Sequence, residues 1–272
     1  MERFYGAKKD KFNPKAQYHK PKLIKLTGKN DMSAYSPGVI NQYSVGRCTG
    51  CGTGGAAHNT AKQLNVKLET FGYSPDFIYN GARYLEGTLN EDAGAYADDV
   101  MTWIKTKSSL LYPKWPLTEE FSNTDPNEYT DKTEKYTIDT FRVDNGVEGI
   151  ESAMMENHPI IICIPFITEW ENYTADVLSI PKESDTLAGW HCMFADYIDC
   201  DEAMVYGQNS WDTSWGLKGR FKMPLESFES FKKWFGGYDV HYITIKVQET
   251  TNTDKCKILS LHKLMKERRL GK

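Results

Sequence analysis

The order of secondary-structure signals along the 272 residues constrains the fold more than any other feature. Helical patterns come first: one over residues 48–66, and two that open at Ser74-Pro75-Asp76 and at Asp92-Ala93-Gly94. A further short helix is expected over residues 146–157. Segments rich in β-branched and aromatic residues then predict strands at 160–167, 190–197, 203–210, 219–223 and 238–247. This segregation predicts an α+β protein with a helical lobe followed by a lobe of strands.

The length fits one domain of two lobes or two small domains. The polar, proline-containing stretch 114–133 predicts a loop that crosses between the lobes. We expect these parts: a basic N-terminal extension over 1–30, a main domain over 31–250 with its helical lobe at about 31–135 and its β lobe at about 136–250, and a basic amphipathic helix over 251–272.

Charge is distributed unevenly over the chain. The net charge is −4, but residues 1–30 carry +7 and residues 255–272 carry +6, so the body between them carries −17. We favour docking of the basic ends on the acidic body, and an acidic protein partner is the alternative. Nucleic-acid binding is not favoured, because the basic residues lack interleaved aromatic side chains. The oligomeric state is not predicted.

No segment predicts membrane insertion or export. The longest apolar run, Ile160 to Ile167, is too short to span a bilayer and contains Pro165. The start of the chain has no apolar h-region, so we expect no secretory signal. A cytoplasmic location is therefore expected, with a virus-derived particle as the alternative. In a reducing compartment the six cysteines are expected to be free thiols: 48, 51, 163, 192, 200 and 256.

Four residues suggest a reaction: Gln42, Cys48, His191 and Asn209 occur in that order. Cys48 lies where a loop enters a helix, whose N-terminus favours a thiolate, and a nearby histidine would lower the thiol pKa further. His191 begins a strand pattern and Asn209 ends the next, so adjacent antiparallel strands would bring the amide to the imidazole. The Gln42 amide and the Cys48 backbone N–H would form an oxyanion hole.

These motifs resemble the papain-like cysteine peptidase family, in particular bacterial and viral members without a long propeptide. The matching segments are Asn41 to Cys48, Gly189-Trp190-His191 and Asn209 to Gly216, and the resemblance covers about residues 31–245. The histidine follows the cysteine by 143 positions and the asparagine by 161. The resemblance implies a papain-like two-lobe fold, with a helical lobe and an antiparallel, barrel-like lobe, and a peptide or protein substrate bound between them. No cofactor and no metal are implied.

By position, the resemblance assigns Cys48 as nucleophile, His191 as general base and acid, Asn209 as its orienting amide and Gln42 as oxyanion donor. Four further positions are expected to line the substrate site. Ala93 and Gly94 match the strand-like edge that holds the substrate backbone. Trp211 would cover the Asn–His contact. Trp190 would narrow the site on the side of the leaving group.

The chain departs from the family pattern near the nucleophile and the base. Arg47 precedes the nucleophile where a small residue is common, and its side chain would favour the thiolate or reach solvent. Gly50-Cys51-Gly52 replaces an aromatic-rich continuation, and Cys192 follows the base. About thirty N-terminal residues are too few for the usual inhibitory propeptide, although a site filled by this segment would indicate self-inhibition.

Several alternatives stay open at this stage. Cys48 and Cys51 have the spacing of a metal knuckle or a redox pair, but a second zinc-binding pair and a βαβ context are both missing. The main prediction is a cysteine endopeptidase. One alternative is an inactive papain-like scaffold that binds peptides or serves in virion assembly. Another is a Cys-His amidase or transpeptidase that acts on cell-wall or isopeptide bonds.

Overall fold

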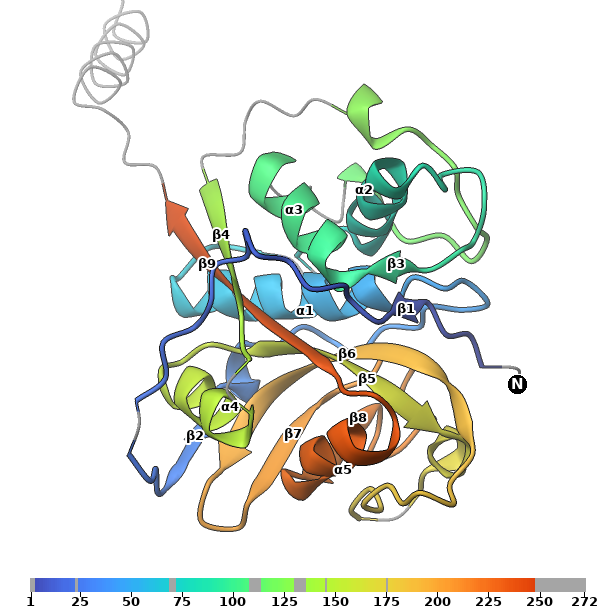
Figure 1. The fold of residues 1–272 in the computed structure, drawn as a ribbon. Helices are drawn as coiled ribbons and strands as arrows, with labels where there is room; N and C mark the ends of the chain where they lie inside the picture. The colour runs from blue at the N-terminus through green and yellow to red at the C-terminus, as the bar shows by residue number, and fades with distance from the viewer. Residues whose placement is uncertain are drawn as a thin grey trace, which may run out of the picture.

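A computed structural model describes residues 3–22, 24–68, 72–107, 114–129, 136–144, 146–174 and 176–247. Helices α1 (Cys48–Gln63), α2 (Pro75–Glu86) and α3 (Ala97–Lys107) form one lobe, and an antiparallel sheet forms the other. Figure 1 shows α1 lying between the other two helices and the sheet. The expected α+β segregation is therefore confirmed.

Glycines let α1 approach its neighbours closely. A Cβ atom on Gly50 would lie 2.2 Å from the Pro75 carbonyl oxygen at the start of α2. A Cβ atom on Gly55 would lie 2.3 Å from the Phe194 ring on strand β6 (Leu187–Asp199). These glycines cost helix propensity of up to about 1 kcal/mol each. The close packing expected from the glycine-rich sequence thus holds α1 against α2 on one side and against the sheet on the other.

The next two helices begin differently. Ser74 caps α2, because its hydroxyl accepts a hydrogen bond from the Phe77 N–H at 3.1 Å, as its sequence predicts. Helix α3 starts at Ala97, so the expected start at Asp92 is wrong. Gly94 has a φ of 70°, and strand β3 (Ala95–Tyr96) follows it. The backbone there pairs with another strand before it can turn into the helix.

The sheet has the strand order β4-β9-β5-β6-β7-β8, and β2 (Lys29–Asp31) also pairs with β6. All neighbouring strands in it are antiparallel. The other members are β4 (Tyr136–Arg142), β5 (Ile160–Ile167), β7 (Met204–Gln208), β8 (Arg220–Pro224) and β9 (Asp239–Val247). No ladder among the described residues joins β8 to β4, so the lobe is an open sheet rather than a closed barrel.

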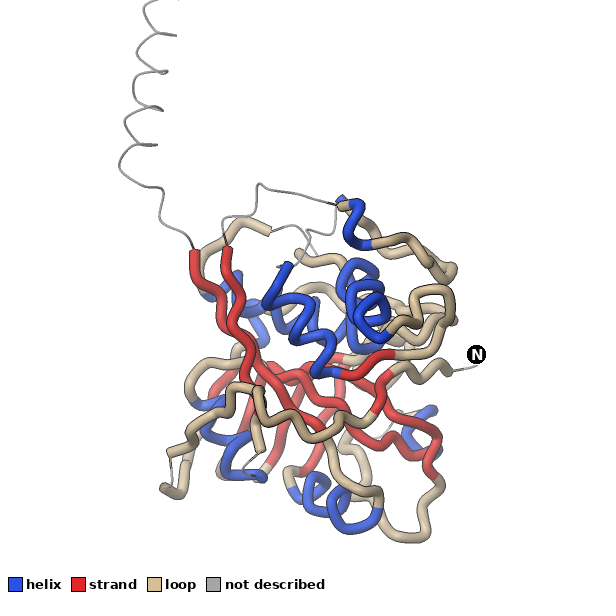
Figure 2. The backbone as a smooth tube through the Cα atoms, turned by 45° about the horizontal axis from the view of Figure 1, so that its top comes forward, coloured by secondary structure: helices blue, strands red, loops and turns tan. Residues whose placement is uncertain are grey.

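Shorter helices pack beyond the sheet, and Figure 2 shows helices on both sides of the strands. They are α4 (Gly146–Met155) and α5 (Glu226–Trp234). The 3-10 turns lie elsewhere: η1 (Ser33–Tyr35) contacts α1, η3 (Pro126–Glu128) contacts α2, and η4 (Thr168–Asn172) contacts β5. One hydrophobic cluster fills the space between the helical lobe and the sheet, and a second lies between the sheet and α4 and α5.

The predicted strands are confirmed within a few residues at their ends, whereas β4 and α5 were not predicted. Residues 114–129 of the expected polar loop are described and contain η3. The expected C-terminal helix over 251–272 lies outside the described residues. Within the described part of the chain, no helix is both long and apolar enough to cross a membrane.

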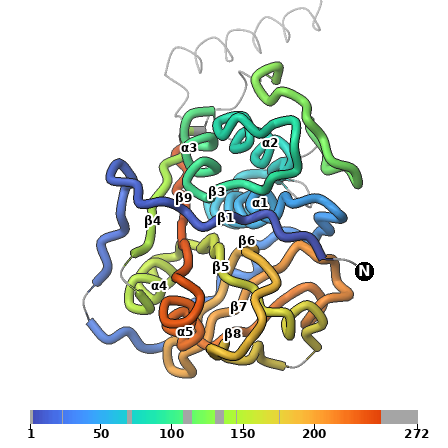
Figure 3. The backbone as a smooth tube through the Cα atoms, turned by 45° about the vertical axis from the view of Figure 1, so that its right-hand side comes forward, coloured from blue at the N-terminus to red at the C-terminus, as the bar shows by residue number. Residues whose placement is uncertain are grey.

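The N-terminal segment runs along the line where the two lobes meet. Strand β1 (Ala7–Lys8) pairs in parallel with β3, with Ala7 opposite Ala95. Figure 3 shows this segment passing between β3 and α1 on one side and the sheet on the other. Residues before the main domain therefore become part of the boundary between the lobes.

Candidate active site

Cys48 is the first residue of α1 and is completely buried. Backbone N–H groups of Cys192 and Gly6 point to its sulfur and lower the thiol pKa. Burial has the larger effect and, with a smaller contribution from Cys163, raises that pKa well above its ordinary value. The thiol is therefore neutral in this arrangement, and its sulfur lies beside the strand that carries His191.

His191 is held by the sheet, on β6, and is also completely buried. Its Nε2 lies 2.7 Å from the Asn209 Oδ1 just beyond β7. Because an amide oxygen only accepts hydrogen bonds, Nε2 carries the ring proton and Nδ1 keeps its lone pair. Nδ1 has no partner among the described residues. Burial lowers the His191 pKa to about 4, so the ring is neutral at neutral pH.

Aromatic rings enclose the imidazole. The Trp211 ring lies 4.5 Å from the His191 ring, and Phe166 meets the imidazole edge-on at 5.2 Å. Trp211 is almost fully buried, as expected of a residue that shields the His–Asn contact. Trp190, one residue before the base, is partly buried and packs against the cluster between the lobes. The hydrogen bond between His191 and Asn209 is thus kept from water.

Gln42 ties the loop before Cys48 to the sheet lobe. Its Nε2 donates to the Val45 carbonyl at 3.0 Å, and its Oε1 accepts from the Ser210 hydroxyl at 2.6 Å. The Gln42 backbone N–H donates to the Ser210 carbonyl at 2.7 Å. Sequence reasoning missed Ser210, although it follows Asn209 directly within the motif that identified the asparagine. The glutamine and the asparagine are therefore placed by neighbouring backbone contacts.

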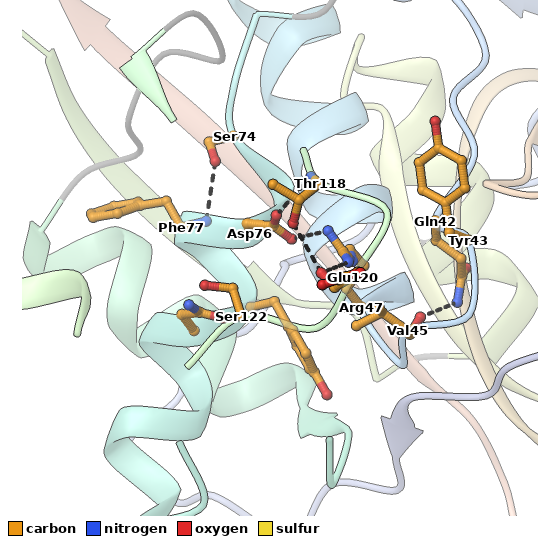
Figure 4. Close-up of polar contacts among 12 residues, drawn as sticks. Gln42, Tyr43, Val45, Arg47, Ser74, Asp76, Phe77, Thr118, Glu120 and Ser122 are labelled. Carbon is orange, nitrogen blue, oxygen red and sulfur yellow. Dashed lines mark hydrogen bonds and ion pairs between the residues drawn. The ribbon is translucent and has the colours of Figure 1, made fainter. Parts of the chain in front are cut away.

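Arg47 is buried, and Figure 4 shows its guanidinium group directed at Asp76 on α2. The two side chains form an ion pair, and a second Arg47 nitrogen donates to the Glu120 carbonyl at 2.9 Å. Asp76 also accepts a hydrogen bond from the Thr118 N–H at 3.3 Å. The expectation that Arg47 reaches solvent is wrong: it joins the start of α1 to α2 and to the following loop.

The Ala93-Gly94 position forms a turn directly before strand β3, whose backbone pairs with β1. The Gly94 N–H donates to the Tyr79 hydroxyl at 3.0 Å, which in turn donates to Asp92 at 2.6 Å. The N–H that faces the other chain segment belongs to Ala95, which sequence reasoning missed. The positive φ at Gly94 is the physical signal for the turn that precedes β3. Ala93 lies just before the turn and is partly exposed.

The N-terminal segment makes hydrogen bonds to β3 and to Gln42. The Gly6 carbonyl accepts from the Ala95 N–H at 2.7 Å, and the Phe4 carbonyl accepts from the Gln42 Nε2 at 3.1 Å. A Cβ atom on Gly6 would lie only 1.6 Å from the Gly46 carbonyl oxygen. Only glycine therefore fits at the point where the segment passes the loop before Cys48.

Tyr5 continues the contact on the other side of Cys48. Its ring meets the His191 ring edge-on at 6.0 Å and the Trp211 ring at 5.8 Å. Its hydroxyl donates to Glu171 at 2.5 Å, while the Arg3 guanidinium lies 4.8 Å above Trp211. Three of the four residues predicted as catalytic (Gln42, Cys48 and His191) thus face the same short stretch of chain.

A charged cluster anchors the segment further along. Asp10 is buried, and its carboxylate lies 3.0 Å from the His241 Nε2 and 3.2 Å from an Arg142 nitrogen. It also accepts a hydrogen bond from the Asp98 N–H at 3.0 Å. Within the described ranges, Asp10, Asp98 and His241 are the only group with metal-ligand spacing, but Arg142 already supplies the positive charge. Five cysteines there are free thiols, and none belongs to that group.

Comparison with known proteins agrees with the geometry. Residues 34–230 match the model of the papain family of cysteine proteases, and the chain belongs to this family. A peptidase C1-like protein of Acanthamoeba polyphaga mimivirus, itself uncharacterised, is 29% identical over 210 residues. That match covers 69% of this chain and 64% of the viral protein, so the chain spans less than two thirds of that relative.

Solved structures share the fold. Xylellain, a cysteine protease from Xylella fastidiosa, has a TM-score of 0.75 at 21% identity, over 90% of this chain and 98% of its own. Procathepsin B of Trypanosoma congolense has a TM-score of 0.71 at 14% identity, over 90% and 87%. Bromelain of Ananas comosus, solved with the inhibitor E64, has a TM-score of 0.60 at 16% identity, over 80% and 99%. The papain-like fold is therefore established.

Proposed function

We propose that this chain is a cysteine endopeptidase in which Cys48 attacks the carbonyl carbon of a peptide bond. Gln42 and the Cys48 N–H hold the oxyanion, and His191 moves the proton. Asn209 keeps the imidazole in the orientation and tautomer that this proton transfer needs. Family membership supports the class of reaction, and the roles of the individual residues are our proposal.

One observation carries the assignment: His191 is fixed through Nε2 while Nδ1 keeps an unpartnered lone pair within the described residues. A base needs this arrangement to take the proton of a thiol. The Cys48 sulfur lies at the backbone N–H of Cys192, the residue next to His191. In our proposal the two residues act on one substrate from the two lobes, Cys48 from a helix N-terminus and His191 from the neighbouring position on strand β6.

The reaction follows from these positions. His191 accepts the thiol proton, and the Cys48 sulfur bonds to the substrate carbonyl carbon while the oxygen takes the negative charge. His191 then gives the proton to the leaving amine as the carbon–nitrogen bond breaks. Water, deprotonated by His191, attacks the thioester, and the acid product leaves with the cysteine restored. Every proton taken by the imidazole is returned, so no cofactor is required.

We infer further that residues 3–10 hold the enzyme in a self-blocked state. The segment presents the Gly6 N–H to the sulfur, and an N–H offers no carbonyl carbon for attack. It also occupies the Gln42 donor and the Ala95 edge. Fewer than ten residues make these contacts, so in this proposal a segment much shorter than the usual inhibitory propeptide blocks the site. The neutral thiol and imidazole of this state become an ion pair once water enters.

Labelling with a peptidyl epoxide, followed by peptide mapping, tests the function in the full chain. We expect a slow adduct on Cys48 in the unaltered protein and a fast one in Gly6→Leu, which cannot keep the segment in place. Cys48→Ala should give neither adduct nor peptide cleavage, and Cys51→Ala, a neighbouring buried thiol, is the matched control. Cleavage that survives in Cys48→Ala would disprove the assignment.

The same experiment separates the alternatives. If Gly6→Leu forms the adduct but no peptide is cleaved, the acceptor is another amide, as in an amidase or transpeptidase. If Cys48 stays unreactive although the segment has been displaced, the chain is a binding scaffold. An acidic partner for residues 255–272 remains a prediction, and those residues lie outside the described structure.

A further inference from the structure

One contact of the N-terminal segment differs from the rest because it is an ion pair with a nearly buried acid. The Lys8 Nζ lies 2.6 Å from the Glu86 Oε2, and the Glu86 side chain is only 7% exposed. The other Glu86 oxygen accepts a hydrogen bond from the Tyr96 N–H at 2.9 Å. Tyr96 is the residue opposite Lys8 in the strand pairing, and its ring lies 5.2 Å below the ammonium group. Glu86 is therefore part of the edge that holds an extended chain.

The negative charge of Glu86 lies at the end of α2 where a carboxylate is unfavourable. It is the last residue of α2, before Gly87, whose φ of 73° ends the helix. The C-terminal end of a helix carries partial negative charge and favours a cation rather than a carboxylate. A glutamate here costs stability unless another group supplies a positive charge.

The surroundings contain more acid. Asp99 lies near enough to Glu86 for repulsion: its pKa is raised to about 6, first by burial and then by Glu86, and is lowered by Lys8. When the segment leaves, Lys8 leaves with it, and Glu86 loses the cation that balances it beside Asp99. A carboxylate without a partner in such acidic surroundings favours an incoming cation. A basic side chain of an incoming peptide would restore the balance.

We propose that Glu86 and Tyr96 form a subsite that selects a lysine or arginine side chain of the peptide substrate, and that Lys8 fills this subsite in the self-blocked state. The inference rests on the proposed peptidase function and adds its substrate class. A carboxylate that receives the ammonium or guanidinium group and an aromatic face beneath it recognise this chemistry together.

The test uses the full chain with Gly6→Leu, which exposes the edge without removing residues. Fluorogenic peptides that carry Lys, Arg, Gln or Glu at each of the four positions before the cleaved bond are compared by kcat/KM. At one position we expect Lys and Arg to exceed Gln by about tenfold, which is about 1.4 kcal/mol. Adding Glu86→Gln should bring that ratio close to one, because glutamine keeps the bond to Tyr96 but loses the charge. Adding Glu86→Lys should favour Glu.

Glu226→Gln, at an exposed position on α5, is the matched control and should leave the ratio unchanged. Cleavage with no preference for a basic residue at any position would overturn the subsite while the peptidase function stands. Absence of cleavage despite a reactive Cys48 would overturn the peptidase function instead.

A second measurement needs no substrate and does not depend on Gly6→Leu. The rate of Cys48 alkylation by iodoacetamide is compared in the unaltered protein, Lys8→Gln, Glu86→Gln and the double variant. Each single change should raise the rate about fivefold, and the double change should add little, because both remove the same pair. Rates that multiply in the double variant, or no effect of Lys8→Gln, would show that Lys8 does not occupy a Glu86 subsite.

Discussion

The two halves of the site differ in how they are completed. In the sheet lobe, His191 and Asn209 lie on or next to paired strands, and a 2.7 Å hydrogen bond already orients the ring. In the helical lobe, Cys48 starts a helix, and one of the two backbone N–H groups at its sulfur comes from Gly6 of the N-terminal segment. The base is assembled by the fold itself, whereas the state of the nucleophile depends on a separate piece of chain.

This difference locates the control of activity. The tautomer of the imidazole is already fixed by Asn209, although Tyr5 of the segment packs against the ring. In the self-blocked state that we propose, the thiol ionises only after the segment leaves and water enters.

The largest expected effect concerns the nucleophile half. Arg47→Ala should lower the free energy of unfolding by about 3–5 kcal/mol, because Asp76 would remain buried without its partner. Urea unfolding followed by tryptophan fluorescence measures this change. The double variant Arg47→Met/Asp76→Leu should recover most of the loss, since no unpaired charge remains. An equal loss in both variants would mean that packing, not charge, holds this end of α1.

A substitution of Gln42 tests both halves of the site together, because Gln42 contacts both. In the Gly6→Leu background, Gln42→Leu should lower kcat by about 10²–10³, equivalent to about 2.7–4 kcal/mol, through loss of an oxyanion donor. Alkylation of Cys48 by iodoacetamide forms no oxyanion and should change little. If alkylation falls as far as peptide cleavage, Gln42 only positions the loop before Cys48.

In the sheet lobe, burial of His191 makes the free energy of unfolding depend on pH. The folded-state His191 pKa of about 4 lies below the ordinary 6.5, so an unfolded chain takes up this proton first as pH falls. The stability from a neutral His191 is complete above pH 6.5 and is lost as pH falls towards 4, by up to about 3 kcal/mol. Asp99, with its pKa raised to about 6, acts in the opposite direction in the same window.

Thermal unfolding at pH 7 and pH 5 measures this effect in the unaltered protein and in His191→Gln. Since Asp99 is common to both, the difference between them isolates the histidine, and the unaltered protein should lose more stability on acidification. Equal losses would mean that the imidazole is more hydrated than its burial indicates.

The smallest expected effect concerns the anchor of the segment. Asp10→Asn keeps the side-chain size but removes the charge facing Arg142 and His241, so the segment should detach more often. We expect Cys48 alkylation about tenfold faster, equivalent to about 1.4 kcal/mol. Asp176→Asn, at a side chain that is 80% exposed, is the control. An unchanged rate would place the anchoring energy at Tyr5 to Lys8 instead.

Local patterns predicted much of the fold because their signals are strong and short in range. The Ser74-Pro75 start of α2 and the apolar β5 were predicted from adjacent residues alone. Strand β4 was missed because it follows the polar stretch 114–133 closely and gains its structure by pairing with β9, about a hundred positions away. Helix α5 was missed because nine residues between strands give a weak periodic signal. The start of α3 was placed early because β1 pairs with the preceding residues.

The sequence alone determined the family and the candidate residues: a cysteine at the start of a glycine-rich helix, a histidine on a strand, and an asparagine and a glutamine in recognisable motifs. These signals depend on residue type and spacing, which are properties of a short stretch of chain. Only the tertiary structure decided that Arg47 is buried against Asp76, that the Ala95 N–H bonds to Gly6, and that residues 3–10 contact Gln42 and His191. Each of these contacts joins segments that lie far apart in sequence, where no periodic or spacing signal connects them.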